Sequence, residues 1–141
     1  MISSVLADRI IKVKDDLHEI HTGAIAYDVH CCGIPEVPST SVASVRVYLH
    51  THYLEARPIL YGFPSRKDRE IFRLLLTAKG VGPNAAMRIF HAMGSASAVS
   101  CLESGDLAPI ARIKGIGPKA VEALSKLKKP RIVEALSLPG F

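Results

Sequence analysis

Two copies of one seven-residue segment organise this sequence: Lys79-Gly80-Val81-Gly82-Pro83-Asn84-Ala85 and Lys114-Gly115-Ile116-Gly117-Pro118-Lys119-Ala120. Five of the seven positions are identical, and a sixth exchanges one β-branched apolar residue for another. Each copy lies between segments in which apolar residues recur with helical spacing. The duplication therefore predicts two repeated units, each a pair of helices joined by a tight hairpin.

The spacing of the glycines explains how such a hairpin would form. The first glycine can adopt the left-handed conformation that ends a helix. The next residue is apolar and points inward, and the second glycine lets another molecule approach the backbone. Proline suits the first turn of the following helix, because its missing N–H is not needed there. The free N–H groups then face outward at a helix N-terminus, where phosphate is the expected ligand.

Both copies fit the helix-hairpin-helix pattern hxxhxGhGxxxA, although Val121 stands where alanine is usual in the second. Contacts of this kind position a protein on DNA without reading bases. Two ordinary helical hairpins with glycine caps are the alternative, but a lysine before the first glycine of each copy favours phosphate binding. The residues expected to bind the DNA backbone are Lys79, Gly80, Val81, Gly82, Asn84 and Arg88, and Lys114, Gly115, Ile116, Gly117, Lys119 and Lys126.

The charge distribution supports a polyanionic partner for the C-terminal half. Through Phe63 the chain has five basic and seven acidic residues, a balance of −2. From Pro64 onward it has thirteen basic and six acidic residues, a balance of +7, which gives the net charge of +5. A basic half beside a mildly acidic one predicts nucleic-acid binding by the former.

The first 63 residues have strand periodicity. Apolar residues alternate with others from Ile25 to Val29 and again from Val45 to Leu49, and two prolines exclude a central strand between 33 and 41. About five short strands without an intervening helix predict a small all-β domain, such as an OB-fold barrel.

Helical periodicity begins at Pro64, with Ser65 as a candidate N-cap. Gly80, Gly94, Gly105 and Gly115 are each expected to end a helix. We therefore predict an α+β fold. Its expected parts are an OB-fold domain over 1–63, a tandem helix-hairpin-helix domain over 64–130, and a tail over 131–141.

Residues 1 to about 130 resemble the RuvA family. Leu60-Tyr61-Gly62-Phe63 matches that family's LYGF signature, and residues 23–29 look like its GVGYEV strand with one residue extra. Both hairpins follow at the family's spacing. The resemblance implies a cytoplasmic homotetramer, pairing as an octamer on DNA, that holds a four-way (Holliday) junction open in recombination and repair. It also implies a RuvB-like ATP-driven motor and a RuvC-like resolvase as partners, and no catalytic residue of its own.

Three departures from the family pattern are visible. The family carries two adjacent acids in an "acidic pin" at the junction centre, where this chain has Glu55 and Ala56 followed by Arg57. We expect altered strand separation rather than lost binding. Asn84 replaces the lysine usual after the first proline. The family's third domain, which docks on the motor, is not present in the 141 residues, so that coupling is in question.

Two other functions remain open. Some DNA glycosylases and nucleases also use helix-hairpin-helix units, but a glycosylase needs an aspartate shortly after its hairpin. Glu103 is the only acidic residue between Gly82 and Gly105. The first acidic residue after Gly117 is Glu122, which lies within the predicted helix. A DNA-binding scaffold with a different partner is the other possibility.

Other chemistry is not favoured by the pattern. The adjacent Cys31 and Cys32 beside His30 are poorly spaced for one metal ion, and His50 and His52 are expected on one face of a strand. There is no phosphate-binding loop of the ATPase type. We expect no metal, no cofactor and no membrane partner. Three cysteines without disulfide spacing favour a reducing compartment.

Overall fold

The computed structural model describes residues 2–38, 44–127, 134 and 137. It divides into two compact units, Met1–Arg69 and Glu70–Gly140. The division falls inside helix α1 (Arg66–Leu76), so the domain boundary at residue 63 stays a prediction. The predicted tail over 131–141 lies, apart from Glu134 and Ser137, outside the described residues.

The first unit contains one six-stranded sheet with the order β1-β5-β6-β4-β3-β2. All neighbouring strands are antiparallel except β4 and β6, which are parallel. The edge strands β1 and β2 do not pair with each other within the described ranges, as in a partly open OB-fold-like barrel. The strands are β1 (Ser4–Ala7), β2 (Arg9–Lys14), β3 (Leu17–Thr22), β4 (Ile25–Cys31), β5 (Val45–Leu54) and β6 (Arg57–Phe63).

The core of this unit follows from the alternation in the strands. Val47 and Leu49 of β5 and Val29 of β4 are fully buried. Gly62 lies between them: a Cβ there would come within 2.8 Å of Val29 Cγ1 and 2.9 Å of Val47 Cγ1. The glycine of the Leu-Tyr-Gly-Phe segment is therefore required by close packing across the sheet.

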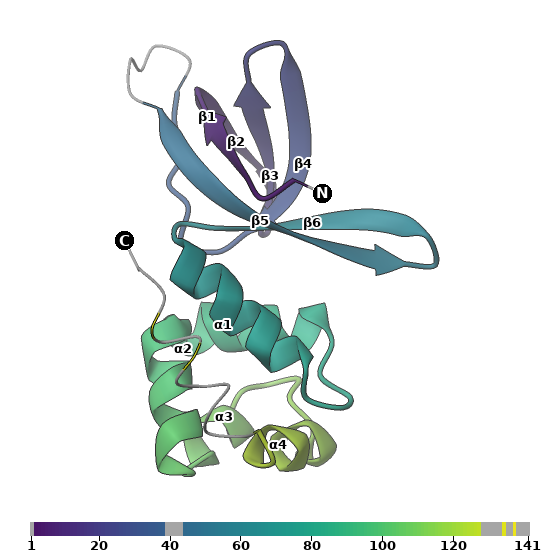
Figure 1. Ribbon diagram of the computed structural model, residues 1–141, viewed down its shortest axis with the longest axis vertical. Helices are drawn as coiled ribbons and strands as arrows, with labels where there is room; N and C mark the ends of the chain where they lie inside the picture. Colours follow the sequence, from purple (N-terminus) through teal and green to yellow (C-terminus); the bar gives the residue numbers. More distant parts are fainter. Residues whose placement is uncertain (1, 39–43, 128–133, 135–136, 138–141) are drawn as a thin grey trace. The chain divides into compact units, whose positions relative to one another are not determined.

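Strands β5 and β6 form a long hairpin whose tip is a two-residue turn (Figure 1). Leu54 pairs with Arg57, and the turn residues Glu55 and Ala56 have φ angles of 50° and 67°. Positive φ at both positions is the signature of a type I′ turn, which matches the twist of the strands. The three predicted pin residues, Glu55, Ala56 and Arg57, are all exposed at this tip.

Four helices follow: α1 (Arg66–Leu76), α2 (Pro83–Ser104), α3 (Ala108–Ala111) and α4 (Pro118–Ser125). The predicted cap of α1 is confirmed, because the Asp68 N–H donates to Ser65 Oγ at 3.1 Å. Gly94 was expected to end a helix, and its φ of 78° and ψ of 167° do break the helical path. Helical backbone resumes directly after it, so α2 consists of two helical segments that meet at a kink at Gly94.

The core of the second unit is formed by the inner faces of these helices. Phe72 of α1 and Phe90 of α2 meet edge to face, with ring centroids 6.0 Å apart. Ile110 of α3 and Leu124 of α4 are buried in the same unit. No helix in the described part is long and apolar enough to cross a membrane.

Candidate nucleic-acid interface

The two hairpins have the backbone conformation that their glycines predict. Gly80 has a φ of 85° and Gly115 a φ of 93°, both in the left-handed region. Val81 and Ile116 are buried, with 5% and 9% of their surface exposed. The N–H of each donates to the turn that follows the preceding helix, Val81 to the Ala78 carbonyl at 3.1 Å and Ile116 to the Ile113 carbonyl at 3.2 Å. These local predictions are confirmed.

The second glycine of each hairpin leaves its backbone open to a partner. Gly82 and Gly117 are extended, and a Cβ on either would meet no heavy atom of the described residues within 4 Å. Pro83 and Pro118 then begin α2 and α4. The N–H groups in the first turn of a helix have no partner within that helix. Both hairpins can therefore present backbone donors to an anion, with the helix dipole in favour.

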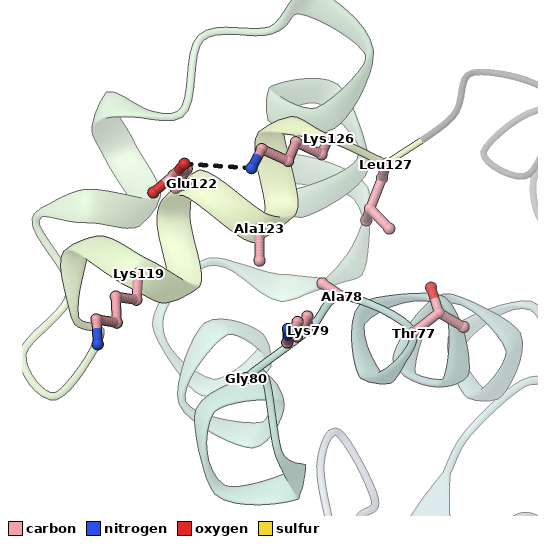
Figure 2. Close-up of a pocket in the computed structure, with 9 residues that line it drawn as sticks. All are labelled: Thr77, Ala78, Lys79, Gly80, Lys119, Glu122, Ala123, Lys126 and Leu127. Carbon is pink, nitrogen blue, oxygen red and sulfur yellow. Dashed lines mark ion pairs between the residues drawn. The ribbon is translucent and has the colours of Figure 1, made fainter.

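A hollow of about 580 Å³ lies between the first hairpin and α4 (Figure 2). The lysines that line it come from both repeats: Lys79 precedes Gly80, whereas Lys119 lies in the first turn of α4 and Lys126 directly follows that helix. Lys126 forms an exposed ion pair with Glu122, with Nζ 3.2 Å from Oε1. The hollow is lined by Thr77, Ala78, Lys79, Gly80, Lys119, Glu122, Ala123, Lys126 and Leu127.

Electrostatics at this hollow favour an anion. Three lysines and one glutamate line the hollow, so its net charge is positive. The ion pair between Lys126 and Glu122 is exposed, and water therefore weakens it. Glu122 and Ala123 were not among the residues expected at the site from the sequence. Their spacing from Lys119 and Lys126 along one helical face is the signal that would have indicated them.

The structure places Arg88 differently from the sequence prediction, which had grouped it with the first hairpin. Its guanidinium lies over Gly115 of the second hairpin, and Nη1 donates to the Lys114 carbonyl at 3.4 Å. Arg88 comes from α2, directly after the first hairpin, but the helix directs it to the other copy. Asn84 and Lys114 are both exposed, Asn84 in the first turn of α2.

His30, Cys31 and Cys32, which are adjacent in the first unit, are held by local contacts and burial. His30 Nδ1 lies 2.7 Å from Asp16 Oδ1. Burial, with a contribution from the Asp16 carboxylate, raises the pKa of Cys31 to about 12. Burial also raises the pKa of Cys32 to about 11, with Asp68 and Asp16 adding to the effect. Thiols with pKa values this high remain protonated and unreactive near neutral pH.

Known proteins resemble both the second unit and most of the chain. Residues 72–126 match the family model described as a SAM-like helix-hairpin-helix tandem. The chain is 36% identical to the Holliday junction branch migration complex subunit RuvA of Shewanella amazonensis, over 80% of this chain and 59% of that protein. It is 31% identical to the RuvA of Chlamydia pneumoniae, over 89% of this chain and 65% of that protein.

A further relative is matched over a larger share of its length. The RuvA of Pseudomonas savastanoi pv. phaseolicola is 33% identical over 92% of this chain and 68% of that protein. The chain thus spans less than two thirds of the first two relatives and slightly more of the third. The matches cover the sheet as well as both hairpins, and the chain belongs to the RuvA family.

Proposed function

We propose that this chain is a non-catalytic subunit that binds four-way (Holliday) junction DNA through its phosphate backbone and supports branch migration. One observation carries the proposal: two hairpins with the same backbone geometry present open glycines and helix N-termini beside lysines. Backbone N–H groups at a helix N-terminus and lysine ammonium groups are both donors to phosphate.

The proposed recognition is by shape rather than sequence. Hairpin amides and lysines contact phosphates, which are the same for every base pair. Two hairpins in one subunit would grip the backbone at two nearby points. Four subunits arranged with four-fold symmetry would then hold the four arms of a junction apart, and this homotetramer is part of the proposal, as is its pairing into an octamer on DNA.

The β5–β6 hairpin is the proposed pin at the junction centre. The Glu55 carboxylate at its tip would repel phosphates and help to separate strands. Ala56 adds no charge and Arg57 adds an opposite one, so the repulsion at this tip is weaker than two acids would give. We expect the chain to bind junctions normally and to separate strands less strongly.

The proposed partners follow from the RuvA family: a RuvB-like ATP-driven motor and a RuvC-like resolvase. The motor partnership can be measured directly as DNA-stimulated ATP hydrolysis of an added RuvB-type motor. Stimulation by this chain on junction DNA supports the branch-migration role. A motor that is never stimulated would leave a junction-binding scaffold as the function.

Backbone recognition can be tested by comparing two junctions of unrelated sequence over a range of salt concentrations. We expect equal affinities and a linear fall of log K with log salt concentration, because released counterions accompany phosphate contacts. An affinity difference of more than about tenfold, the range that a bidentate base contact produces, would contradict the proposal.

A further inference from the structure

The two hairpins differ at their first glycine. A Cβ on Gly80 would meet no heavy atom within 4 Å among the described residues. A Cβ on Gly115 would lie 2.9 Å from both Cζ and Nε of Arg88 and 3.0 Å from its Cδ. The guanidinium of Arg88 therefore covers the second hairpin, whereas the first hairpin is open at the equivalent place.

Arg88 also bonds to the hairpin that it covers. Its Nη1 donates to the carbonyl of Lys114, the residue before Gly115, at 3.4 Å. A guanidinium is flat and carries five N–H donors, so it can lie against a glycine and bond to a neighbouring carbonyl at the same time. This combination ties α2 of the first repeat to the hairpin of the second.

The repeat explains why only one hairpin is covered. Arg88 follows Gly80 at the same distance in sequence as Ala123 follows Gly115. Ala123 lines the hollow beside Lys79 and Gly80 (Figure 2). Each repeat thus places the equivalent helix position at the hairpin of the other, but arginine fills the space on one side and a methyl group leaves it open on the other.

We propose that Arg88 is a positioning residue: it clasps the second hairpin and holds the backbone from Lys114 to Gly117 in the form that receives phosphate. The first hairpin has no such clasp among the described residues and depends on its own backbone and on the lysines of the hollow. The functional part of this inference rests on the proposed function, whereas the clasp itself is a property of the free protein.

Amide hydrogen exchange of the free protein tests the clasp without DNA. The Ile116 amide bonds to Ile113 in the second hairpin, and the Val81 amide bonds to Ala78 in the first, so they form a matched pair. Arg88→Ala should speed exchange at Ile116 about two- to tenfold, the range expected for one net hydrogen bond, and leave Val81 unchanged. Unchanged exchange at Ile116 would overturn the proposal.

Two further variants distinguish the proposed clasp, which depends on the shape of the guanidinium, from an effect of positive charge alone. Arg88→Lys keeps the charge but cannot lie flat on Gly115, so it should restore only part of the protection at Ile116. Full restoration would overturn the clasp. Arg112→Ala removes the same charge from another exposed arginine of this unit and should leave Ile116 unchanged; equal acceleration by this variant would also count against the proposal.

Junction binding then tests the consequence. Arg88→Ala should weaken binding about two- to tenfold, with partial recovery in Arg88→Lys. Wild-type affinity in Arg88→Ala, in a protein that does bind junctions, would overturn the positioning role and leave the proposed function intact. If the unaltered chain fails to bind junctions, the proposed function fails, and the exchange result still decides whether the clasp exists.

Discussion

Lys79 and Lys119 line the same hollow although they belong to different copies of the repeat. Lys79 precedes the first hairpin, and Lys119 lies in the first turn of α4 after the second (Figure 2). Lysines from the two repeats therefore share one basic surface in the second unit. This juxtaposition means that a change in the second repeat should alter the charge beside the first hairpin.

Lys119→Glu should weaken junction binding and flatten its salt dependence. Loss of one phosphate contact lowers the slope of log K against log salt concentration by about 0.9. The measurement is a salt titration of junction binding. Lys14→Glu, an exposed reversal of the same charge on β2, serves as the control. An unchanged slope in Lys119→Glu would show that Lys119 does not contact phosphate.

The two first glycines should respond differently to alanine. Both have left-handed φ angles, so Gly80→Ala and Gly115→Ala should each lower the free energy of unfolding by roughly 1–2 kcal/mol. Alanine at 115 also displaces the flexible end of Arg88, which adds the loss of its hydrogen bond, about 1 kcal/mol.

Urea unfolding of the single variants and of Gly115→Ala in an Arg88→Ala background measures this difference. In the absence of Arg88 the extra cost at position 115 should disappear, so the two glycines become equivalent. Equal costs for Gly80→Ala and Gly115→Ala in the unaltered protein would contradict the account of Arg88.

Features that depend on residues close together in the sequence could be predicted. The left-handed glycines and the cap at Ser65 depend on neighbouring residues alone, and the apolar character of Val81 and Ile116 indicated their burial. The all-β character of the first unit followed from the alternation of apolar residues, because one face of each strand is buried. The phosphate-binding roles of the hairpin residues stay predictions.

Features decided by distant contacts could not be predicted. Strand β1 is short, and it pairs with β5 so that Ser4 lies opposite Tyr48, a residue distant from it in the sequence. The parallel pairing of β4 with β6 is likewise a property of the assembled sheet. The position of Arg88 depends on how α2 packs against the second repeat, whereas the sequence had placed it with the first hairpin.

The charge of the β5–β6 tip should affect strand separation more than affinity. Ala56→Asp adds a second acid beside Glu55, and aspartate tolerates the left-handed φ of 67° better than alanine does. Fluorescence of 2-aminopurine at the crossover should rise in Ala56→Asp and fall in Glu55→Gln. Because exposed charges interact weakly, junction affinity should stay within about fivefold in both. An unchanged signal in both variants would exclude the tip as a pin.

The thiols of Cys31 and Cys32 should react slowly at pH 8 and faster as the pH approaches 11. Their pKa values of about 12 and about 11 lie above the ordinary value of 9.0, so the folded chain keeps protons that the unfolded chain releases. The stability that these thiols contribute is therefore complete below pH 9 and lost as the pH rises through 11 and 12. Iodoacetamide labelling followed by mass spectrometry, with the urea-unfolded chain as reference, measures this. Labelling of both thiols at pH 8 as fast as in the unfolded chain would contradict their raised pKa values.

The proposed function requires that the paired hairpins recognise the shape of a four-way junction. It is tested most directly by comparing the affinity of the chain for a synthetic four-way junction with that for linear duplex of the same length and sequence, at one salt concentration. We expect a preference for the junction of about a hundredfold or more, a difference of roughly 2.7 kcal/mol in binding free energy. Equal affinity for the two DNAs would contradict it and leave a generic binder of the phosphate backbone.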